Sequence, residues 1–487
     1  MKRTIVFRVF LFLLLIMMSG CLKLGPEYER PELDVEVPTE YENAAGDDGA
    51  PPGGEPWWHV FNDPDLNLLV EEVTRNNLDV KQATARVLEL HYQVVQTKAN
   101  RFPQVGLQAQ AKRQQQPIIG ILPGGTVSAE NNVFTLALPA SFEWDLWGRL
   151  ARAEEASRAE MLQAVEARHT ITQTVVAEAV SLYLQIEALE RQIQITDRSI
   201  ASFKRSRDLV ERRYRSGLSS ILDVRQARRL LAQAESLLPD LRQNLSVAQQ
   251  NLSVLHGNYP RTHPPRLQPE DYFKRLDPVP PGLPSDLLQR RPDVRAAEEN
   301  LKSLNALIGY AKANRFPRIT LTGSFGYSSD ELATLFQPES QLYNIAADMA
   351  QPLFEAGKRK AAQRAAEARY EQAAAAYVKT VLTAFADVES AIVTRQQKIE
   401  RRDRVVVFLR EARAALEIAE SRYLRGLLEY LNVLDAQQSL FLAEQDLTLV
   451  DLAILTNRVA LHRALGGGWA DPGPVEEPSK KKDKNTG

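Results

Sequence analysis

Four stretches of the chain alternate apolar and polar residues, which is the period of a β-strand with one apolar face. In one of them, Ile319, Leu321 and Phe325 are separated by threonine, glycine and serine residues. The four predicted strands lie at residues 105–112, 134–144, 319–327 and 343–353. Aromatic residues near the strand ends are typical of the interfacial girdle of a transmembrane barrel; they are Trp144, Trp147, Tyr327 and Tyr343.

A longer period governs the segments that follow the strands. Leu150–Arg215 contains neither proline nor glycine, which allows a helix on the order of 100 Å long. Its apolar residues step by three and four from Val175 to Val210, and a second stripe begins at Val176. The same rhythm recurs from Val381 to Leu416 and includes Val406. Such heptads predict coiled-coil packing, with the first helix contacting neighbours on two sides.

The chain repeats itself. Lys98–Pro103 and Lys312–Pro317 both read KANRFP, and Tyr214–Leu218 (YRSGL) is matched by Tyr423–Leu427 (YLRGL). Each half reads as a helix, two strands, a long helix, a tight turn and a further helix. Copies of roughly 200 residues are too long for a solenoid unit, so the pattern indicates internal duplication of one large module.

The beginning of the chain resembles a bacterial lipoprotein signal. Lys2 and Arg3 precede an apolar run, Ile5–Met17, that is too short for a membrane span. Met18-Ser19-Gly20-Cys21 then resembles a lipobox, in which cleavage before Cys21 leaves that residue to be lipidated. The alternative is an ordinary secretory signal followed by an incidental cysteine.

These patterns divide the chain into six parts. A stretch rich in proline, glycine and acidic residues suits an extended tether, and the lysine-rich C-terminus suits a disordered tail. The predicted parts are a signal peptide (1–20), a lipidated tether (21–58), a first repeat (59–257), a linker (258–283), a second repeat (284–465) and the tail (466–487).

Four strands are too few for a barrel. A single-chain transmembrane barrel needs at least about eight strands, and an open sheet edge leaves backbone groups unpaired in hydrocarbon. Copies of the chain must therefore complete the wall, which makes the protein a symmetric oligomer.

Composition argues against several other functions. Lys and Arg number 60 against 62 Asp and Glu, so the chain has no overall basic field for nucleic acid. Cys21 is the single cysteine and the six histidines show no ligand spacing, so we expect no disulfide, metal site or cofactor. No catalytic motif is present, and an energy source must belong to a partner.

Several motifs carry a resemblance to a known family. They are Phe-Pro at the start of each first strand, WDLWGR at Trp144–Arg149, the two YxxG turns with the LDV and LNVLDAQ that follow them, GPEYERP at Gly25–Pro31 and FNDPDL at Phe61–Leu66. With them the chain resembles the outer-membrane efflux family of TolC and OprM, and in particular its lipoprotein branch. The resemblance covers the chain from Cys21 to about residue 465.

The resemblance implies a mixed fold. It is a homotrimer whose twelve-stranded β-barrel in the bacterial outer membrane continues into a long α-helical coiled-coil tunnel through the periplasm. The implied partners are a periplasmic adaptor, or membrane fusion protein, and an inner-membrane pump of the proton-driven RND type, which together expel drugs or other small molecules. The alternative is a lipid-anchored coiled-coil structural protein without a pore, for which four alternating strands would have no use.

The turns between long helices are the predicted periplasmic end. Gly217 and Gly426 fit helix C-caps that need a positive φ. The resemblance also implies that these turns contact the adaptor; the residues concerned are Arg215, Ser216, Gly217, Leu218, Arg425, Gly426 and Leu427.

The resemblance further implies a pore gate beyond the second turn. Asp435 matches a ring of acidic side chains that narrows the pore, and Asn432 lies where some family members have a second aspartate. A trimeric carboxylate ring would favour cations, although Asp435 could instead complement a helix dipole. Asp223 is the equivalent of Asn432 in the first repeat. Tyr423 is placed by the resemblance in contacts that hold the end shut, and could equally be a core residue.

Overall fold

A computed structural model describes residues 23–32, 41–43, 56–118, 127–268, 276, 279 and 284–467. The predicted signal peptide, Cys21 and the C-terminal tail beyond residue 467 lie outside the described residues. Of the helices described, none is both long enough and apolar enough to span a bilayer. The chain divides into two compact units, and Val87–Ala164 and Ala297–Tyr377 belong to the first.

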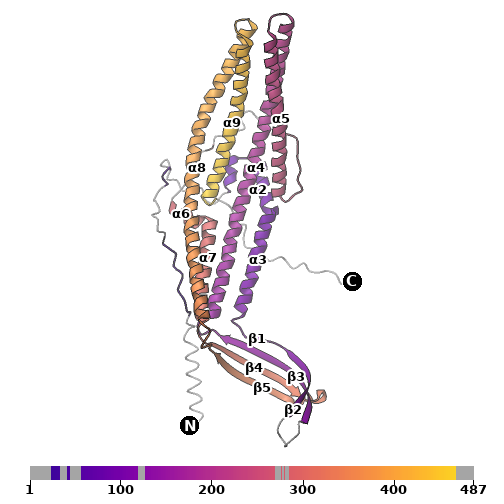
Figure 1. The fold of residues 1–487 in the computed structure, drawn as a ribbon, viewed down its shortest axis with the longest axis vertical. Helices are drawn as coiled ribbons and strands as arrows, with labels where there is room; N and C mark the ends of the chain where they lie inside the picture. Colours follow the sequence, from indigo (N-terminus) through magenta and orange to yellow (C-terminus); the bar gives the residue numbers. More distant parts are fainter. Residues whose placement is uncertain are drawn as a thin grey trace. The chain divides into compact units, whose positions relative to one another are not determined.

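The two repeats contain helices of equal length (Figure 1). Helices α3 (Leu78–Ala99) and α7 (Pro292–Ala313) have 22 residues each, α4 (Arg149–Arg215) and α8 (Lys358–Leu424) have 67, and α5 (Ile221–Leu255) and α9 (Tyr430–Ala464) have 35. The shorter elements are η1 (Trp57–Phe61), α2 (Pro64–Asn76), α6 (Pro284–Arg290), η2 (Leu332–Thr334) and η3 (Pro338–Ser340). The prediction of a duplicated module with long helices is confirmed.

One antiparallel sheet lies in the first unit. Its strands are β1 (Gln104–Val105), β2 (Gln108–Ile118), β3 (Val127–Trp144), β4 (Arg318–Ser329) and β5 (Gln341–Ala350). β1 and β2 both pair with β3, which pairs with β4, which pairs with β5. In this register Phe325 is opposite both Leu138 and Tyr343. Because directly opposite residues share a face, the predicted apolar positions that fall within the strands lie on one side of the sheet.

Strand boundaries differ from the prediction in several places. The first strand is interrupted at Gly106, whose N–H donates to the Pro139 carbonyl at 2.9 Å; proline has no N–H with which to complete the ladder there. β2 and β3 also extend beyond the predicted ends, to Ile118 and back to Val127. The alternating pattern fails in these polar extensions, so backbone pairing rather than an apolar face defines them. At the other edge, β5 ends at Ala350 and not at residue 353.

Helix α4 buries two apolar stripes, as predicted. Val175 and Ala179 pack with Val73, whereas Val176 and Val180 pack against a cluster that contains Trp57, Leu66 and Val459. A helix with apolar residues on two faces must contact neighbours on both. The core of the second unit is therefore built around this rod.

Toward the end of α8 the predicted stripe is wrong at Val406. Val405, Ala412 and Ala419 are buried there at heptad spacing, whereas Val406 is 39% exposed. Small side chains at a helix contact allow closer approach of the two axes, and the packing selects the alanine face over the bulkier one. In this part of α8, Val406, Val407 and Phe408 are left at the surface.

The residue before α3 and the residue before α7 each form a hydrogen bond to the end of the last helix of their repeat, α5 or α9. In the first repeat, Asn77 Nδ2 donates to the Leu255 carbonyl at 2.8 Å. In the second, Arg291 occupies the matching position, and its Nη1 donates to the Ala464 carbonyl at 3.2 Å. The repeats thus make the same connection with different side chains.

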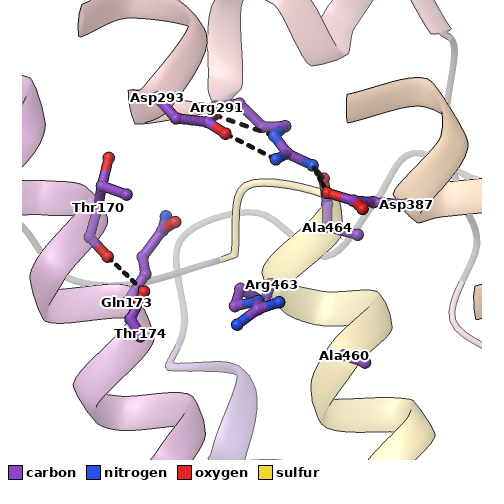
Figure 2. A pocket seen from close by; sticks show the side chains of 9 residues that line it. All are labelled: Thr170, Gln173, Thr174, Arg291, Asp293, Asp387, Ala460, Arg463 and Ala464. Atoms are coloured by element: carbon purple, nitrogen blue, oxygen red, sulfur yellow. Dashed lines mark hydrogen bonds and ion pairs between the residues drawn. The ribbon is translucent and has the colours of Figure 1, made fainter. Parts of the chain in front are cut away.

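Arg291 is paired further. Figure 2 shows its guanidinium between the carboxylates of Asp293 and Asp387, at 2.7 Å and 3.0 Å. These residues border a polar cavity of about 260 Å³ that Arg463 and Gln173 also line. Two carboxylates and a carbonyl offset the cost of burying the cation.

A glycine follows each of α5 and α9 and packs against the backbone just before α3 or α7. Gly257 and Gly466 have φ of +78° and +82°, and a Cβ on either would lie 2.9 Å from the carbonyl oxygen of Asn76 or Arg290, respectively. Positive φ and this close approach both require glycine.

We predict that Gly466→Ala lowers the melting temperature more than Gly426→Ala does. Gly426 also has a positive φ, +76°, but has open space around it, so its replacement costs only the left-handed backbone strain of about 1 kcal/mol. Gly466→Ala adds the collision with Arg290. Thermal melting in detergent compares the two variants, and equal shifts would contradict the packing role.

A buried ion pair joins α8 and α9 in the second unit. Arg402 Nε donates to Asp451 Oδ1 at 2.5 Å, and the Asp451 side chain is 3% exposed. Burial raises the pKa of Asp451 to about 6, and Arg402 opposes this rise only in part. The folded protein therefore binds this proton more tightly than the unfolded chain does.

Asp451 should make the fold relatively more stable in mild acid. Because its folded pKa is raised, its stabilising contribution is complete below about pH 4 and is lost as the pH rises through about 6, a change of up to about 3 kcal/mol. The melting temperature of wild type relative to that of Asp451→Asn should therefore rise as the pH is lowered from 7 to 5. The exposed Asp240→Asn is the control, and parallel curves for wild type and Asp451→Asn would contradict the shift.

Candidate functional site at the helix turns

The two turns between long helices have the same hydrogen bonds. Gly217 and Gly426 have φ of +71° and +76°. Leu218 N–H donates to the Arg213 carbonyl at 2.8 Å, and Leu427 N–H donates to that of Arg422 at 2.9 Å. This is the Schellman pattern, in which a left-handed glycine ends the helix. The sequence YxxGL thus dictates both turns.

A capping box starts α5 after the first turn. Ser220 Oγ accepts from Asp223 N–H at 3.1 Å, and an Asp223 carboxylate oxygen accepts from Ser220 N–H at 2.9 Å. Asp223 is half-buried and has a local structural role. The Ser-x-x-Asp spacing is a sequence signature of this arrangement.

The start of α9 lacks that box. Glu429 occupies the N-cap position without a side-chain hydrogen bond to the helix. Asn432 is exposed, and its Nδ2 donates to the Glu429 carbonyl at 3.3 Å. The second hairpin therefore starts its return helix with weaker capping than the first hairpin.

Asp435 is exposed on α9 one turn beyond Asn432. Within the described residues, its carboxylate forms no hydrogen bond or ion pair. It is the sixth residue of a helix that begins at Tyr430, and helix-dipole stabilisation falls off within the first turn. The dipole interpretation of Asp435 is thus weak, and the carboxylate is available to solvent or to another chain.

Tyr423 lies in the core that the two hairpins share. It is 5% exposed, its hydroxyl is 3.2 Å from Ser219 Oγ, and the Arg213 guanidinium lies over its ring at 4.8 Å. Tyr430 packs beside it with ring centroids 5.6 Å apart. The equivalent residue of the first repeat, Tyr214, is 43% exposed. The single chain therefore supports the core interpretation of Tyr423, in a contact that joins one hairpin to the other.

Sequence reasoning missed two partners of Tyr423. Arg213 and Tyr430 lie next to the recognised turns, but their roles depend on which hairpin faces which. Burial raises the pKa of the Tyr430 hydroxyl, which lies 3.2 Å from Ser206 Oγ. The one available signal was the pair of aromatic residues on either side of the second turn.

Large apolar side chains surround the turns. Leu218 and Leu427 are 67% and 68% exposed, and Arg215 and Arg425 beside them are exposed as well. Leu222, Leu424 and Leu431 extend this surface. A cluster of exposed leucines rimmed by charge is typical of a protein-binding surface. Across the described residues, no group of His, Cys, Asp and Glu side chains could hold a metal ion.

Comparison with known proteins identifies the family. Residues 69–258 and 283–467 match the outer membrane efflux protein family. The chain belongs to this family. Outer membrane protein OprJ of Pseudomonas aeruginosa is 33% identical over 463 residues, which are 94% of this chain and 95% of OprJ. The cation efflux system protein CusC of Escherichia coli O6:H1 is 31% identical over 465 residues, 94% of this chain and 98% of CusC.

A solved structure agrees. The outer-membrane channel OprN superposes with a TM-score of 0.84 at 29% identity, over 92% of this chain and 99% of OprN. The present chain, as a member of this family, is therefore an outer-membrane efflux channel and not an enzyme. The predicted fold, function and outer-membrane location are confirmed, and the family assignment favours the channel over a pore-free structural protein.

We predict that Ser220→Ala frays the start of α5. Loss of the capping box costs about 1 kcal/mol, which corresponds to amide exchange about fivefold faster in the first turn. Hydrogen exchange with mass spectrometry measures this rate. Glu429→Ala is the matched control, because Glu429 forms no cap; an equal effect of the two changes would contradict the assigned difference.

Proposed function

We propose that three copies of this chain close a barrel and form a passive exit duct. The observation that supports this proposal is that the sheet has unpaired edges. In its described part, β2 pairs only with β3 and β5 pairs only with β4, so the outer edges of β2 and β5 are left for other copies. Three contributions of four strands exceed the minimum of about eight for a membrane barrel.

Exposed apolar residues on the helices support association. Val406, Phe408 and Ile418 on α8 and Leu442 and Leu449 on α9 are between 39% and 55% exposed. A monomer would present these side chains to water along much of each helix, whereas neighbouring copies would bury them. The same packing that excludes Val406 from the core of one chain makes it available to the next.

The leucines and arginines at the turns fit a protein partner. We propose that they contact a periplasmic adaptor, which connects the duct to an inner-membrane pump of the RND type. The turn residues Arg215–Leu218 and Arg425–Leu427 belong to this contact. CusC is a cation efflux protein by name, but among the described residues of the present chain no group of His, Cys, Asp and Glu side chains could hold a metal ion. Selection of the exported small molecules is therefore assigned to the pump.

The signal pattern supports a lipid anchor. Lipidation of Cys21 after removal of residues 1–20 would attach the chain to the outer membrane in addition to its strands, with the chain extending into the periplasm. The division into tether (21–58), repeats (59–257 and 284–465), linker (258–283) and tail (466–487) remains part of this proposal.

The gate proposal concerns Asp435. Three symmetry-related copies of this exposed carboxylate would form a ring, and Asn432 would add a neutral polar ring one turn earlier. Like charges held close together repel and favour a bound cation. Asp223, engaged in its capping box, contributes less to the ring than Asp435 does, and Tyr423 holds the hairpins together behind it.

We predict that Asp435→Ala widens the pore and weakens its block by multivalent cations. Removal of the ring eliminates both the three side chains that narrow the pore and the site that binds a trivalent cation. Single-channel conductance in planar bilayers, with hexaamminecobalt(III) added from the turn side, should show block at least about tenfold weaker than in wild type.

Asp240→Ala is the matched control, because it removes an exposed carboxylate from the middle of α5. It should leave both the conductance and the cation block unchanged. Pores that behave alike in wild type and Asp435→Ala would remove the gate from this position. A folded, membrane-inserted sample without pores would contradict the duct itself.

A further inference from the structure

Residues Lys23–Glu32 lie against helices of both repeats within the first unit. Leu24 N–H donates to the Trp147 carbonyl at 3.2 Å. Arg152 on α4 donates from Nε to the Leu24 carbonyl at 3.1 Å and from Nη2 to the Pro26 carbonyl at 3.2 Å. The Arg152 side chain is 4% exposed and also pairs with Glu155 at 3.0 Å. A buried guanidinium that binds two carbonyls of the segment fixes its path.

Helix α7 of the second repeat also binds this segment. Asn305 Nδ2 donates to the Pro26 carbonyl at 3.1 Å. Further along, Arg30 makes a two-pronged pair with Glu298, at 3.3 Å from Nε and 2.6 Å from Nη2, and the Lys302 ammonium lies 5.7 Å from the centre of the Tyr28 ring. A planar, bidentate pair adds directional specificity to charge attraction. The segment thus ties α4 to α7.

Two glycines allow the segment to cross α7 at backbone distance. Gly25 has a φ of +111°, and a Cβ on it would lie 2.5 Å from Gly309 Cα. A Cβ on Gly309 would lie 2.8 Å from the Leu24 carbonyl oxygen and 2.8 Å from Arg152 Nε. Neither position can accept a side chain without displacing the segment.

The duplicated fold offers a comparison. In the first repeat, Val95 occupies the position of Gly309 and is 52% exposed. Ala361 occupies the position of Arg152 in the second repeat and is exposed. The matching places therefore carry neither the glycine nor the arginine. The residues that fit the segment occur together between α4 and α7, which marks them as a specific receptor and not a by-product of the fold.

We propose that Arg152, Glu298 and Gly309 form a receptor for residues 23–32, and that this receptor determines where the lipid anchor is held. Lys23 lies against Gly148, where an added Cβ would be 2.8 Å from Lys23 Cα, shortly after β3 ends at Trp144. An anchor attached two residues before Lys23 could lie at most about 7 Å from it, so the receptor would determine the position of the anchor. The anchor position, but not the receptor, rests on the proposed lipidation of Cys21.

Limited trypsin digestion of the full-length protein in detergent tests the receptor. The Lys23–Leu24 bond is protected while Leu24 is held by Trp147 and Arg152, and Arg30 precedes a proline that blocks cleavage. Gly309→Ala, Arg152→Ala and Gly25→Ala should each speed cleavage at Lys23 at least about tenfold. Gly25→Ala changes only the segment itself, so it can be interpreted even if a helix variant fails to fold.

Gly323→Ala is the matched control. It makes the same chemical change, but its new Cβ meets nothing closer than 3.6 Å, and cleavage should remain as slow as in wild type. Circular dichroism checks that each variant keeps its helices. Cleavage of Gly25→Ala and Gly309→Ala at the wild-type rate would overturn the receptor.

Mass spectrometry of the released fragment tests the anchor separately. An acylated Cys21-Leu22-Lys23 peptide is the expected product. A fragment without acyl chains would overturn the anchor position and the proposed lipidation while the protection measurement stands. Pore formation is read from neither experiment, so failure of the receptor is distinguishable from failure of the channel proposal.

Discussion

The open edges of the sheet, in which β1 and β2 together count as one of four strands, constrain the rest of the molecule. In hydrocarbon, each unpaired N–H or C=O costs several kcal/mol, and the described sheet leaves one side of β2 and one side of β5 unpaired. The apolar face of the sheet suits contact with lipid, but it does not pair the backbone N–H and C=O groups at those edges. Closure by further copies is the physical solution, and the exposed apolar residues of α8 and α9 are consistent with it.

Duplication supplies equal parts that the chain uses unequally. Helix lengths match pair by pair. Asn77 and Arg291 make equivalent hydrogen bonds, to the Leu255 and Ala464 carbonyls. The turns share a hydrogen-bond pattern, yet a capping box strengthens α5 alone. Tyr423 is buried where Tyr214 is exposed. The first hairpin thus has the stronger helix cap, whereas the second hairpin supplies both the buried Tyr423 and the exposed Asp435.

The strands and long helices could be predicted because period two and heptad patterns each reflect one dominant burial direction. The polar ends of β2 and β3 could not, because backbone pairing alone defines them. Val406 was misplaced because two apolar faces compete on α8 and the alanine face wins. The Asp223 capping box was readable from Ser220-x-x-Asp223, whereas the core position of Tyr423 depended on a contact between hairpins. The docking of residues 23–32 was hidden by a composition typical of a tether.

Native mass spectrometry of the detergent-extracted protein tests the central claim most directly. The account predicts one dominant species with the mass of three chains, because three four-stranded contributions close the barrel. The same spectrum should show no folded monomer, since a monomer retains two open sheet edges. A stable monomer or dimer that still inserts into bilayers would contradict the claim that the edges of β2 and β5 pair between copies.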